Sequence, residues 1–131
     1  MDERTLASIA LFESLPSRAR AAIARHADEM DVREGTELAR QGDFAYEFFV
    51  IEEGTAEVLR DGEPIAELGP GDFLGEMGIV GKSVRNATVR TTSAARVIVM
   101  SEQEFRSMAR TNPEVASRIE AAVEQRCQAL A

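Results

Sequence analysis

Two residues of opposite charge, Glu76 and Arg85, lie in a glycine-rich part of the chain and are the best candidates for chemistry. Glu76 stands between Gly75 and Gly78, and Arg85 follows it by nine residues. A short helix that begins here would point free backbone N–H groups outward from its first turn, which favours an anion. The guanidinium of Arg85 can hold two phosphate oxygens, and a carboxylate can accept a hydrogen bond from a sugar hydroxyl. The pattern predicts a ligand with a singly charged phosphate beside a sugar, since Glu76 would repel a polyphosphate.

The charge of this segment also favours an anionic ligand. The whole chain has 15 Lys and Arg residues against 23 Asp and Glu residues, so its formal net charge is −8. Between residues 71 and 90, however, three basic residues outnumber two acidic ones. A protein that binds nucleic acid through its phosphates is normally basic, so the overall charge argues against that class.

A nucleotide triphosphatase is the first alternative, because Gly75 and the run 81–83 (Gly-Lys-Ser) are spaced almost like a Walker A loop. That loop has four residues between its glycines, whereas five separate them here. It must also open a helix, whereas residues 84–89 read as a strand. We therefore reject this alternative.

The chain has one histidine, His26, and one cysteine, Cys127, so few reactions that depend on these residue types are possible. Neither has a neighbour in the sequence that suggests a nucleophile and its base. The two residues together cannot build a zinc site, and a metal-binding cupin would need several histidines. We expect neither catalysis nor a metal.

The elements that must position Glu76 and Arg85 are short strands in the middle of the chain. The alanine- and arginine-rich segment 17–27 predicts a helix, and the apolar residues ahead of it predict a shorter one. Beyond Met30, apolar stretches alternate with glycine-centred turns, and Asp61-Gly62 has the form of a hairpin turn. Strands are expected at 48–51, 55–59, 65–68, 88–92 and 96–100.

Helices are expected again after residue 100. Ser101 and Glu104 have the spacing of a capping box, and Asn112 would cap a last helix that starts at Pro113. The last helix has an apolar stripe that recurs every four residues and predicts either core packing or a dimer contact. The stripe consists of Val115, Ile119, Val123 and Cys127.

These elements predict one domain that is mainly β with flanking helices. We expect N-terminal helices over residues 1–29, a β-roll of the jelly-roll type over 30–100 and two C-terminal helices over 101–131. Hydrophobic residues make up 44% and charged residues 29% of the chain, which is typical of a folded domain. No apolar run approaches the ~18 residues of a membrane span, and the lone cysteine and charged start predict a cytoplasmic location.

The run from Gly71 to Val89 resembles the phosphate-binding cassette of cyclic nucleotide-binding domains. The matching letters are GDFLGEM followed, after seven residues, by RNATV. The family includes bacterial catabolite activators, protein kinase A regulatory subunits and cyclic-nucleotide-gated channels. Weaker similarities in the same order, such as Gln41-Gly42-Asp43, extend the resemblance over nearly the whole chain.

The resemblance implies roles for individual residues. Glu76 would bind the ribose 2′-hydroxyl and Arg85 the cyclic phosphate, with backbone N–H groups completing the phosphate site. Asn86 stands where the family usually has Ala, Ser or Thr, so the choice between cAMP and cGMP stays open, with cAMP expected first. The implied ligand-binding set is Val58, Ile65, Leu74, Gly75, Glu76, Met77, Gly78, Arg85, Asn86 and Ala87.

The function implied by the resemblance is that of a sensor without enzymatic activity, which uses no cofactor beyond its ligand. Its C-terminal helices would move when a cyclic nucleotide binds, and the signal would pass to an effector protein or to an effector domain outside this chain. We expect no direct contact with nucleic acid or membrane; a homodimer through the last helix stays open. Two alternatives remain: a ligand-free interaction domain of the same fold, in which Glu76 and Arg85 form a structural salt bridge, and a small nucleotide hydrolase.

Overall fold

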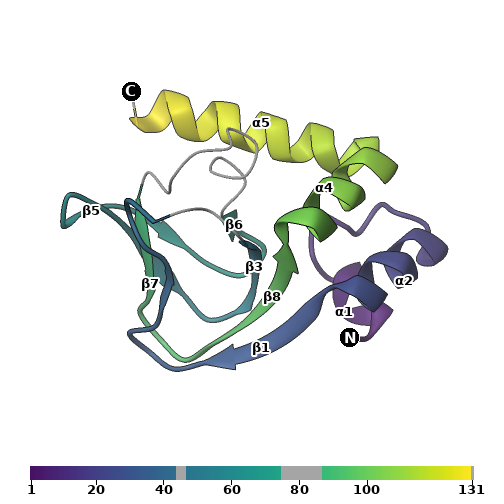
Figure 1. Cartoon of the computed structure of the whole chain (residues 1–131), viewed down its shortest axis with the longest axis horizontal. Helices are drawn as coiled ribbons and strands as arrows, with labels where there is room; N and C mark the ends of the chain where they lie inside the picture. Colours follow the sequence, from purple (N-terminus) through teal and green to yellow (C-terminus); the bar gives the residue numbers. More distant parts are fainter. Residues whose placement is uncertain (44–46, 75–86, 131) are drawn as a thin grey trace.

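The structure is a computed structural model that describes residues 1–43, 47–74 and 87–130, with side chains as far as residue 122. Figure 1 shows a β-roll with helices gathered at one side and a long last helix that crosses above the roll. The helices are α1 (Glu3–Ala7), α2 (Ser17–His26), α4 (Glu102–Thr111) and α5 (Pro113–Leu130). The strands are β1 (Asp28–Val32), β2 (Glu37–Ala39), β3 (Glu47–Glu53), β4 (Ala56–Arg60), β5 (Glu63–Leu68), β6 (Phe73–Leu74), β7 (Thr88–Thr91) and β8 (Ala95–Ser101).

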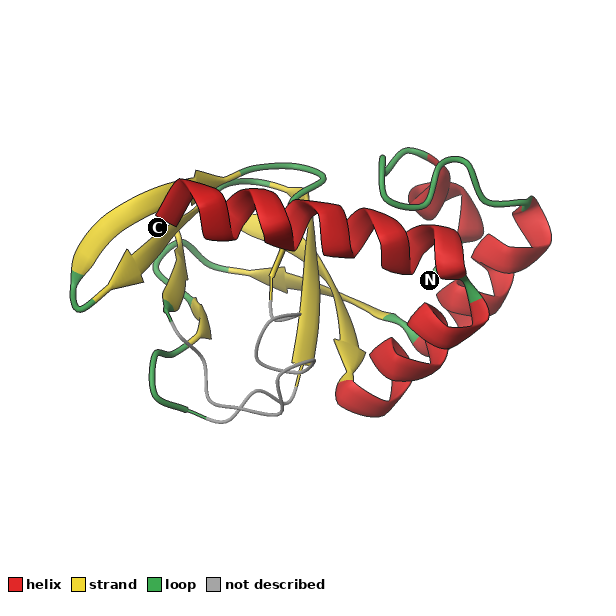
Figure 2. Ribbon diagram, turned by 90° about the horizontal axis from the view of Figure 1, so that it is seen from above, coloured by secondary structure: helices red, strands yellow, loops and turns green. Residues whose placement is uncertain are grey.

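The strands form two antiparallel sheets of four strands each. The first has the order β1-β8-β3-β6 and the second the order β2-β7-β4-β5. The chain crosses repeatedly from one sheet to the other. Figure 2 shows the shorter helices grouped beyond one end of the strands, whereas α5 runs from this group across the strands. This architecture confirms the predicted fold class, a β-roll with helices before and after it.

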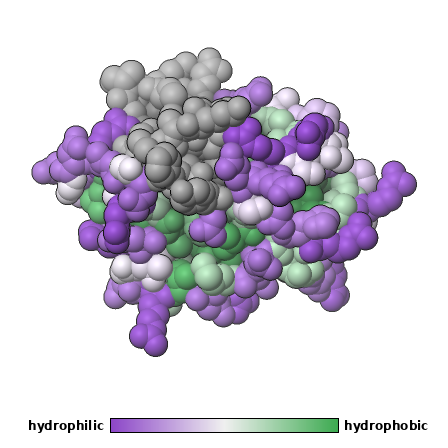
Figure 3. All heavy atoms as spheres, in the orientation of Figure 1, coloured by the Kyte–Doolittle hydropathy of each residue, from purple (hydrophilic) through white to green (hydrophobic). Residues whose placement is uncertain are grey.

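Strand β3 of the first sheet is buried on both faces, because it has four consecutive buried residues, 48–51. Phe48 and Val50 belong to an apolar cluster shared with the helices, whereas Phe49 and Ile51 belong to a second cluster inside the roll. Alternate side chains of a strand point to opposite faces, so a continuous apolar run serves both clusters. Hydrophobic side chains are visible in the middle of the face in Figure 3, with hydrophilic ones around them.

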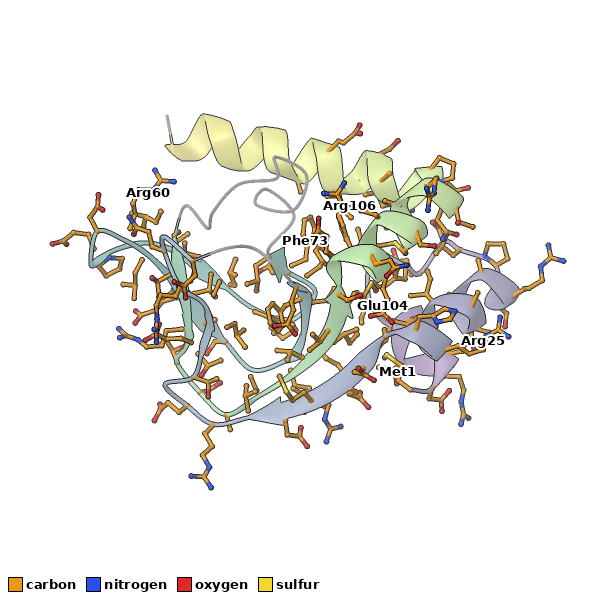
Figure 4. The ribbon with its side chains drawn as sticks, viewed as in Figure 1. Met1, Arg25, Arg60, Phe73, Glu104 and Arg106 are labelled. Carbon is orange, nitrogen blue, oxygen red and sulfur yellow. The ribbon has the colours of Figure 1, made fainter. Side chains whose placement is uncertain are left out.

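Three aromatic rings connect the roll to the C-terminal helices. The ring centroid of Phe48 lies 4.5 Å from that of Phe105 on α4 and 5.7 Å from that of Phe73 on β6. Figure 4 shows Phe73 between the roll and α4. Each fully buried side chain of this size stabilises the fold by roughly 1.5–3 kcal/mol, so this contact fixes the position of α4 on the first sheet.

Local signals at the C-terminal helices are confirmed, with one difference. Ser101 and Glu104 form the expected capping box at the start of α4, and α5 begins at Pro113. The side chain of Asn112, however, donates to the carbonyl of Met108 at 3.1 Å and so closes α4. The start of α5 is satisfied by the backbone carbonyl of Asn112, which accepts hydrogen bonds from the amides of residues 115 and 116.

The N-terminal part differs from the prediction in two places. The expected first helix is shorter, because α1 ends at Ala7 and residues 9–15 form turns that bury Leu11 and Phe12. β1 was not predicted at all and begins at Asp28. Its sequence DEMDV has no alternating apolar pattern, since four of its five residues are exposed on a sheet edge. Among the helices in the described part of the chain, none is long and apolar enough to cross a membrane.

Candidate functional site

The candidate site lies where β6 ends and β7 begins, because these strands hold the two ends of the segment with Glu76 and Arg85. β6 ends at Leu74 and pairs with β3 in the first sheet. β7 begins at Thr88 and lies between β2 and β4 in the second sheet. The segment therefore connects the two sheets, and both of its attachment points are part of the roll.

The attachment points are fixed by the cluster inside the roll. Leu74 is 4% exposed and packs in this cluster together with Val89 of β7. Val58 on β4 is half-buried, packs against the same cluster and lies opposite Val89 in the register. The structure thus brings together two of the predicted site residues, Leu74 and Val58. The predicted residue Ala87, just ahead of β7, is buried as well.

Ile65 lies at an irregularity of the β4–β5 ladder. Val58 is paired with Ala66, but the next residue, Leu59, is paired with Pro64, so β5 has one extra residue at Ile65. A β-bulge of this kind redirects a side chain and increases the local twist, and such bulges are frequent beside binding sites. Ile65 is half-buried on the strand next to Val58, as the sequence predicted.

The hairpin tip is a two-residue turn, also as predicted. Asp61 and Gly62 have φ of 54° and 82°, the combination of a type I′ turn. The amide of Asp61 donates to Oε1 of Gln41 at 2.9 Å, and Nε2 of Gln41 donates to Oδ1 of Asp61 at 2.9 Å.

Gln41 also contacts the strand that leaves the candidate site. Its backbone amide donates to the hydroxyl of Thr88 at 3.0 Å. Gln41 therefore connects the start of β7 to the β4–β5 hairpin, the two elements that contribute Ala87, Val58 and Ile65. This role could not be predicted from the sequence, because the partners of Gln41 are 20 and 47 residues away and have no recognisable spacing.

Two charged side chains on the neighbouring strands β4 and β7 are paired. Arg90 on β7 forms a salt bridge with Glu57 on β4, with 2.8 Å between Nη2 and Oε1. This pairing neutralises part of the positive charge counted for residues 71–90. Glu57 is half-buried, as is Glu52 on β3.

Arg118 on α5 has partners in the N-terminal turns. Its Nη1 donates to the carbonyls of Ala10 and Leu11 at 3.0 and 2.9 Å, and its Nη2 bonds the hydroxyl of Ser14. These bonds hold its guanidinium against the N-terminal turns. Val115 and Ile119 of the apolar stripe are buried in the chain's own core, so that half of the stripe is not a dimer contact here.

Comparison with known proteins decides the family. The family model of the cyclic nucleotide-binding domain matches residues 29–112, which include the strands from β2 to β8, all but the first residue of β1, and α4. The chain belongs to the cyclic nucleotide-binding domain family. A cAMP-dependent protein kinase regulatory subunit of Schizosaccharomyces pombe is 31% identical over 104 residues, which cover 79% of this chain and 25% of that protein. This cyclic nucleotide-binding domain thus spans about a quarter of the length of that relative.

Solved structures agree with the fold. The cAMP-bound PfPKA-R has a TM-score of 0.88 at 20% identity, over 98% of this chain and 44% of that chain. The regulatory subunit of a cAMP-independent protein kinase A from Trypanosoma cruzi, bound to guanosine, has a TM-score of 0.81 at 22% identity, over 92% of this chain and 44% of that chain. At these identities the likeness shows a common fold.

The remaining predicted ligand residues of this cyclic nucleotide-binding domain lie outside the described residues. They are Gly75, Glu76, Met77, Gly78, Arg85 and Asn86. Their roles stay predictions. The structure describes Leu74 and Ala87, the buried residues at either end of this segment, and places Val58 and Ile65 on the neighbouring strands β4 and β5. We call these four residues the frame of the site.

A cavity of about 370 Å³ lies between α2 and α4, on the helical side of the domain. Its wall includes Ile23, Met100 and Met108, and the exposed His26 stands at its margin. Among the described residues of its wall, Glu104 is the one carboxylate, and it is already bonded in the capping box. We find no catalytic arrangement in it, and the described residues contain no group of three or more His, Cys, Asp or Glu side chains that could hold a metal ion.

Proposed function

We propose that this chain binds a 3′,5′-cyclic purine nucleotide, cAMP in preference to cGMP, and acts as a regulatory domain without enzymatic activity. The family match over residues 29–112 carries the proposal, because this range contains the whole segment with Glu76 and Arg85. The cyclic phosphate has one negative charge, which suits one arginine and backbone N–H groups better than a polyphosphate would.

The frame of the site supports this ligand. Val58, Ile65 and Leu74 give the roll an apolar side next to the segment, suited to a purine and a ribose. Small-molecule sites typically combine such a surface with a few polar groups that fix orientation. Glu76 at the ribose and Arg85 at the phosphate would be those groups.

The effector is proposed to be another protein or a domain outside this chain, and the C-terminal helices are proposed to carry the signal. We propose that α5 shifts when ligand binds, because Asn112 interrupts the helical structure between α4 and α5. A homodimer through α5 would have to use Val123 and Cys127, since Val115 and Ile119 are core residues.

Guanosine is the second candidate ligand, because a protein with the same fold is bound to it. A nucleoside has no phosphate, so its binding would make little use of Arg85. Replacing Arg85 should therefore strongly weaken the binding of cAMP and leave the binding of guanosine nearly unchanged.

The test is isothermal titration of the chain with cAMP, cGMP, guanosine and 5′-AMP, each also titrated into Arg85→Ala. We expect saturable heat with cAMP, weaker binding of 5′-AMP and a large loss with Arg85→Ala. The matched control is Arg18→Ala, an exposed arginine on α2, which should bind as the unmodified chain does. Absence of heat and of a melting shift with every cyclic nucleotide would favour the ligand-free alternative, because a ligand that binds only the folded state must stabilise it.

A further inference from the structure

Two acidic side chains meet across the middle of the first sheet, away from the candidate site. Glu29 lies on β1 and Glu52 on β3, the two strands that flank β8. Glu29 is opposite Ile98 of β8, and a β-bulge between Ile51 and Glu53 makes Glu52 the extra residue of β3. A side-chain hydrogen bond with Glu29 is one of the causes, after burial, that raise the pKa of Glu52.

A hydrogen bond between two carboxyl groups needs a proton, because ionised carboxylates only accept hydrogen bonds. The atom Oε2 of Glu52 is enclosed and has no donor among the residues that the structure describes. An enclosed acceptor without a donor is costly, and a proton on the pair removes that cost. Geometry therefore favours a shared proton between Glu29 and Glu52.

The charged groups around the pair do not neutralise the two carboxylates in place of this proton. Arg96 on β8 is the neighbouring cation, but its Nε donates to Oδ1 of Asp31 on β1 at 2.9 Å. Glu53 on β3 adds a further negative charge beside Glu52. Three acids in addition to Glu52 thus face one arginine on this part of the sheet.

Burial, followed by the hydrogen bond and the negative charge of Glu29, raises the pKa of Glu52 to about 7. Arg96 acts in the opposite direction and Glu53 in the same direction, both more weakly. The pair would then lose its proton within the neutral range, and not near pH 4 as an ordinary glutamate does.

We propose that Glu29 and Glu52 form a proton-dependent clasp that holds the edge strand β1 to the roll. When protonated, the pair joins β1 to β3 over β8; when ionised, the two carboxylates repel each other and β1 loosens. β1 depends on such a contact because it is an edge strand that pairs with β8 alone and is mostly exposed. One residue, Ala27, separates β1 from α2, so release of β1 would also reach the N-terminal helices.

The sign of the pH effect follows from the raised pKa. Between about pH 4.5 and 7 the folded chain holds a proton that the unfolded chain has lost, so stability falls as pH rises through this range. The contribution of this pair to the stability of the unmodified chain should be largest below this pH range and should no longer change with pH above it.

The test compares the melting temperature of the unmodified chain and Glu52→Gln from pH 5 to pH 8. Glutamine can donate to Glu29 without titrating, so the variant should lose the decline with pH. We expect the unmodified chain to lose about 4 °C more than the variant over this range. Groups other than Glu52 are the same in both proteins, so their contribution cancels in the difference. The control is Glu53→Gln, which should keep the decline.

Equal pH profiles for the unmodified chain and Glu52→Gln would overturn the proposal. If Glu52→Gln does not fold, hydrogen exchange on the unmodified chain decides. Protection factors of the β1 amides, corrected for the intrinsic pH dependence of exchange, should fall between pH 5.5 and 8 relative to those of the central strand β8. Unchanged relative protection would reject the clasp. Neither measurement involves a nucleotide, so this proposal stands or fails independently of the proposed function.

Discussion

Arg118 of α5 donates a hydrogen bond from Nη1 to the backbone carbonyl of Leu11, 107 residues earlier, at 2.9 Å. The same turn of α5 buries Ile119 in a cluster that contains Leu11 and Phe12. A polar anchor and an apolar contact therefore join the start of α5 to the turns of residues 9–15. Any motion of α5 that keeps these contacts must carry the N-terminal turns with it.

Arg118→Ala should destabilise the domain by about 1–3 kcal/mol, because two backbone carbonyls and the hydroxyl of Ser14 lose their charged donor. Urea denaturation measures this loss directly. Arg118→Lys should recover little of the loss, since an ammonium group does not have the planar fork that reaches several acceptors. Arg18→Ala, at an exposed position, is the control and should change stability by less than about 0.5 kcal/mol. Equal stabilities of Arg118→Ala and Arg18→Ala would show that the anchor does not hold in solution.

Gly54→Ala should be severely destabilising. A Cβ at this position would lie 2.6 Å from the carbonyl oxygen of Ala94 and 2.8 Å from the Cα of Ala95, in a backbone with φ of +94°. Both obstacles are backbone atoms, so the turn between β3 and β4 would have to move. Gly62→Ala is the matched control, because φ there is +82° but nothing lies within 4 Å. The control should cost about 1 kcal/mol from backbone strain alone, and Gly54→Ala clearly more. Similar melting temperatures for the two variants would contradict the close approach.

Short-range signals explain why much of the fold could be predicted. The capping box of Ser101 and Glu104, and the turn at Asp61-Gly62, each rest on a few neighbouring residues whose types determine the local geometry. The apolar run of β3 could be predicted as buried for the same reason. β1 could not, because an exposed edge strand needs no apolar pattern; its position follows from pairing with β8, some 70 residues later.

The frame of the site was only partly predictable. The family resemblance located Val58 and Ile65 on neighbouring strands, and the structure confirms that placement. The contacts of Gln41 with Asp61, and of Arg118 with Leu11, join positions that no sequence spacing connects. The same is true of Glu29 and Glu52, which meet only because β8 brings their strands together.

Removing either charged ligand group should weaken cyclic nucleotide binding, and by different amounts. Arg85→Ala should cost roughly 2–5 kcal/mol of binding free energy, because the phosphate charge loses its partner. Glu76→Ala should cost about 1–3 kcal/mol, because a neutral hydroxyl loses its acceptor. Titration calorimetry measures both, and the melting temperature of the ligand-free variants serves as the control. If Arg85→Ala instead destabilises the ligand-free chain strongly, the structural salt bridge of the ligand-free alternative is the better explanation.

Asn86 should influence the choice of base. The family usually has a smaller or hydroxyl-bearing residue here, and threonine often accompanies a preference for cGMP. Asn86→Thr should therefore raise the affinity for cGMP relative to cAMP. Competition binding with both nucleotides on the unmodified chain and the variant gives this ratio directly. An unchanged ratio would mean that Asn86 does not contact the ligand.

Cyclic nucleotide should move α5 as a rigid rod together with the N-terminal turns. The helix contains neither Gly nor Pro after Pro113, so it has no internal hinge, whereas Asn112 provides one just before its start. Spin labels at Glu63 on the hairpin and at Gln125 on α5, in a Cys127→Ser background, should show a changed distance distribution with saturating cAMP. A second pair at Glu13 and Gln125 is the matched control.

The control pair should keep its distance, because Arg118 and Ile119 hold α5 to the turns that contain Glu13. A change in the Glu63 pair alone supports the rigid-rod mechanism. A change in both pairs would show that α5 leaves the N-terminal turns, and a change in neither would show binding without a switch. A ligand shifts the equilibrium between the two positions of α5 only as far as its affinities for the two differ. We therefore expect a coupling free energy of about 1–3 kcal/mol. Arg118→Ala should then alter the control pair and leave the Glu63 pair responsive to ligand, which distinguishes the anchor from the hinge.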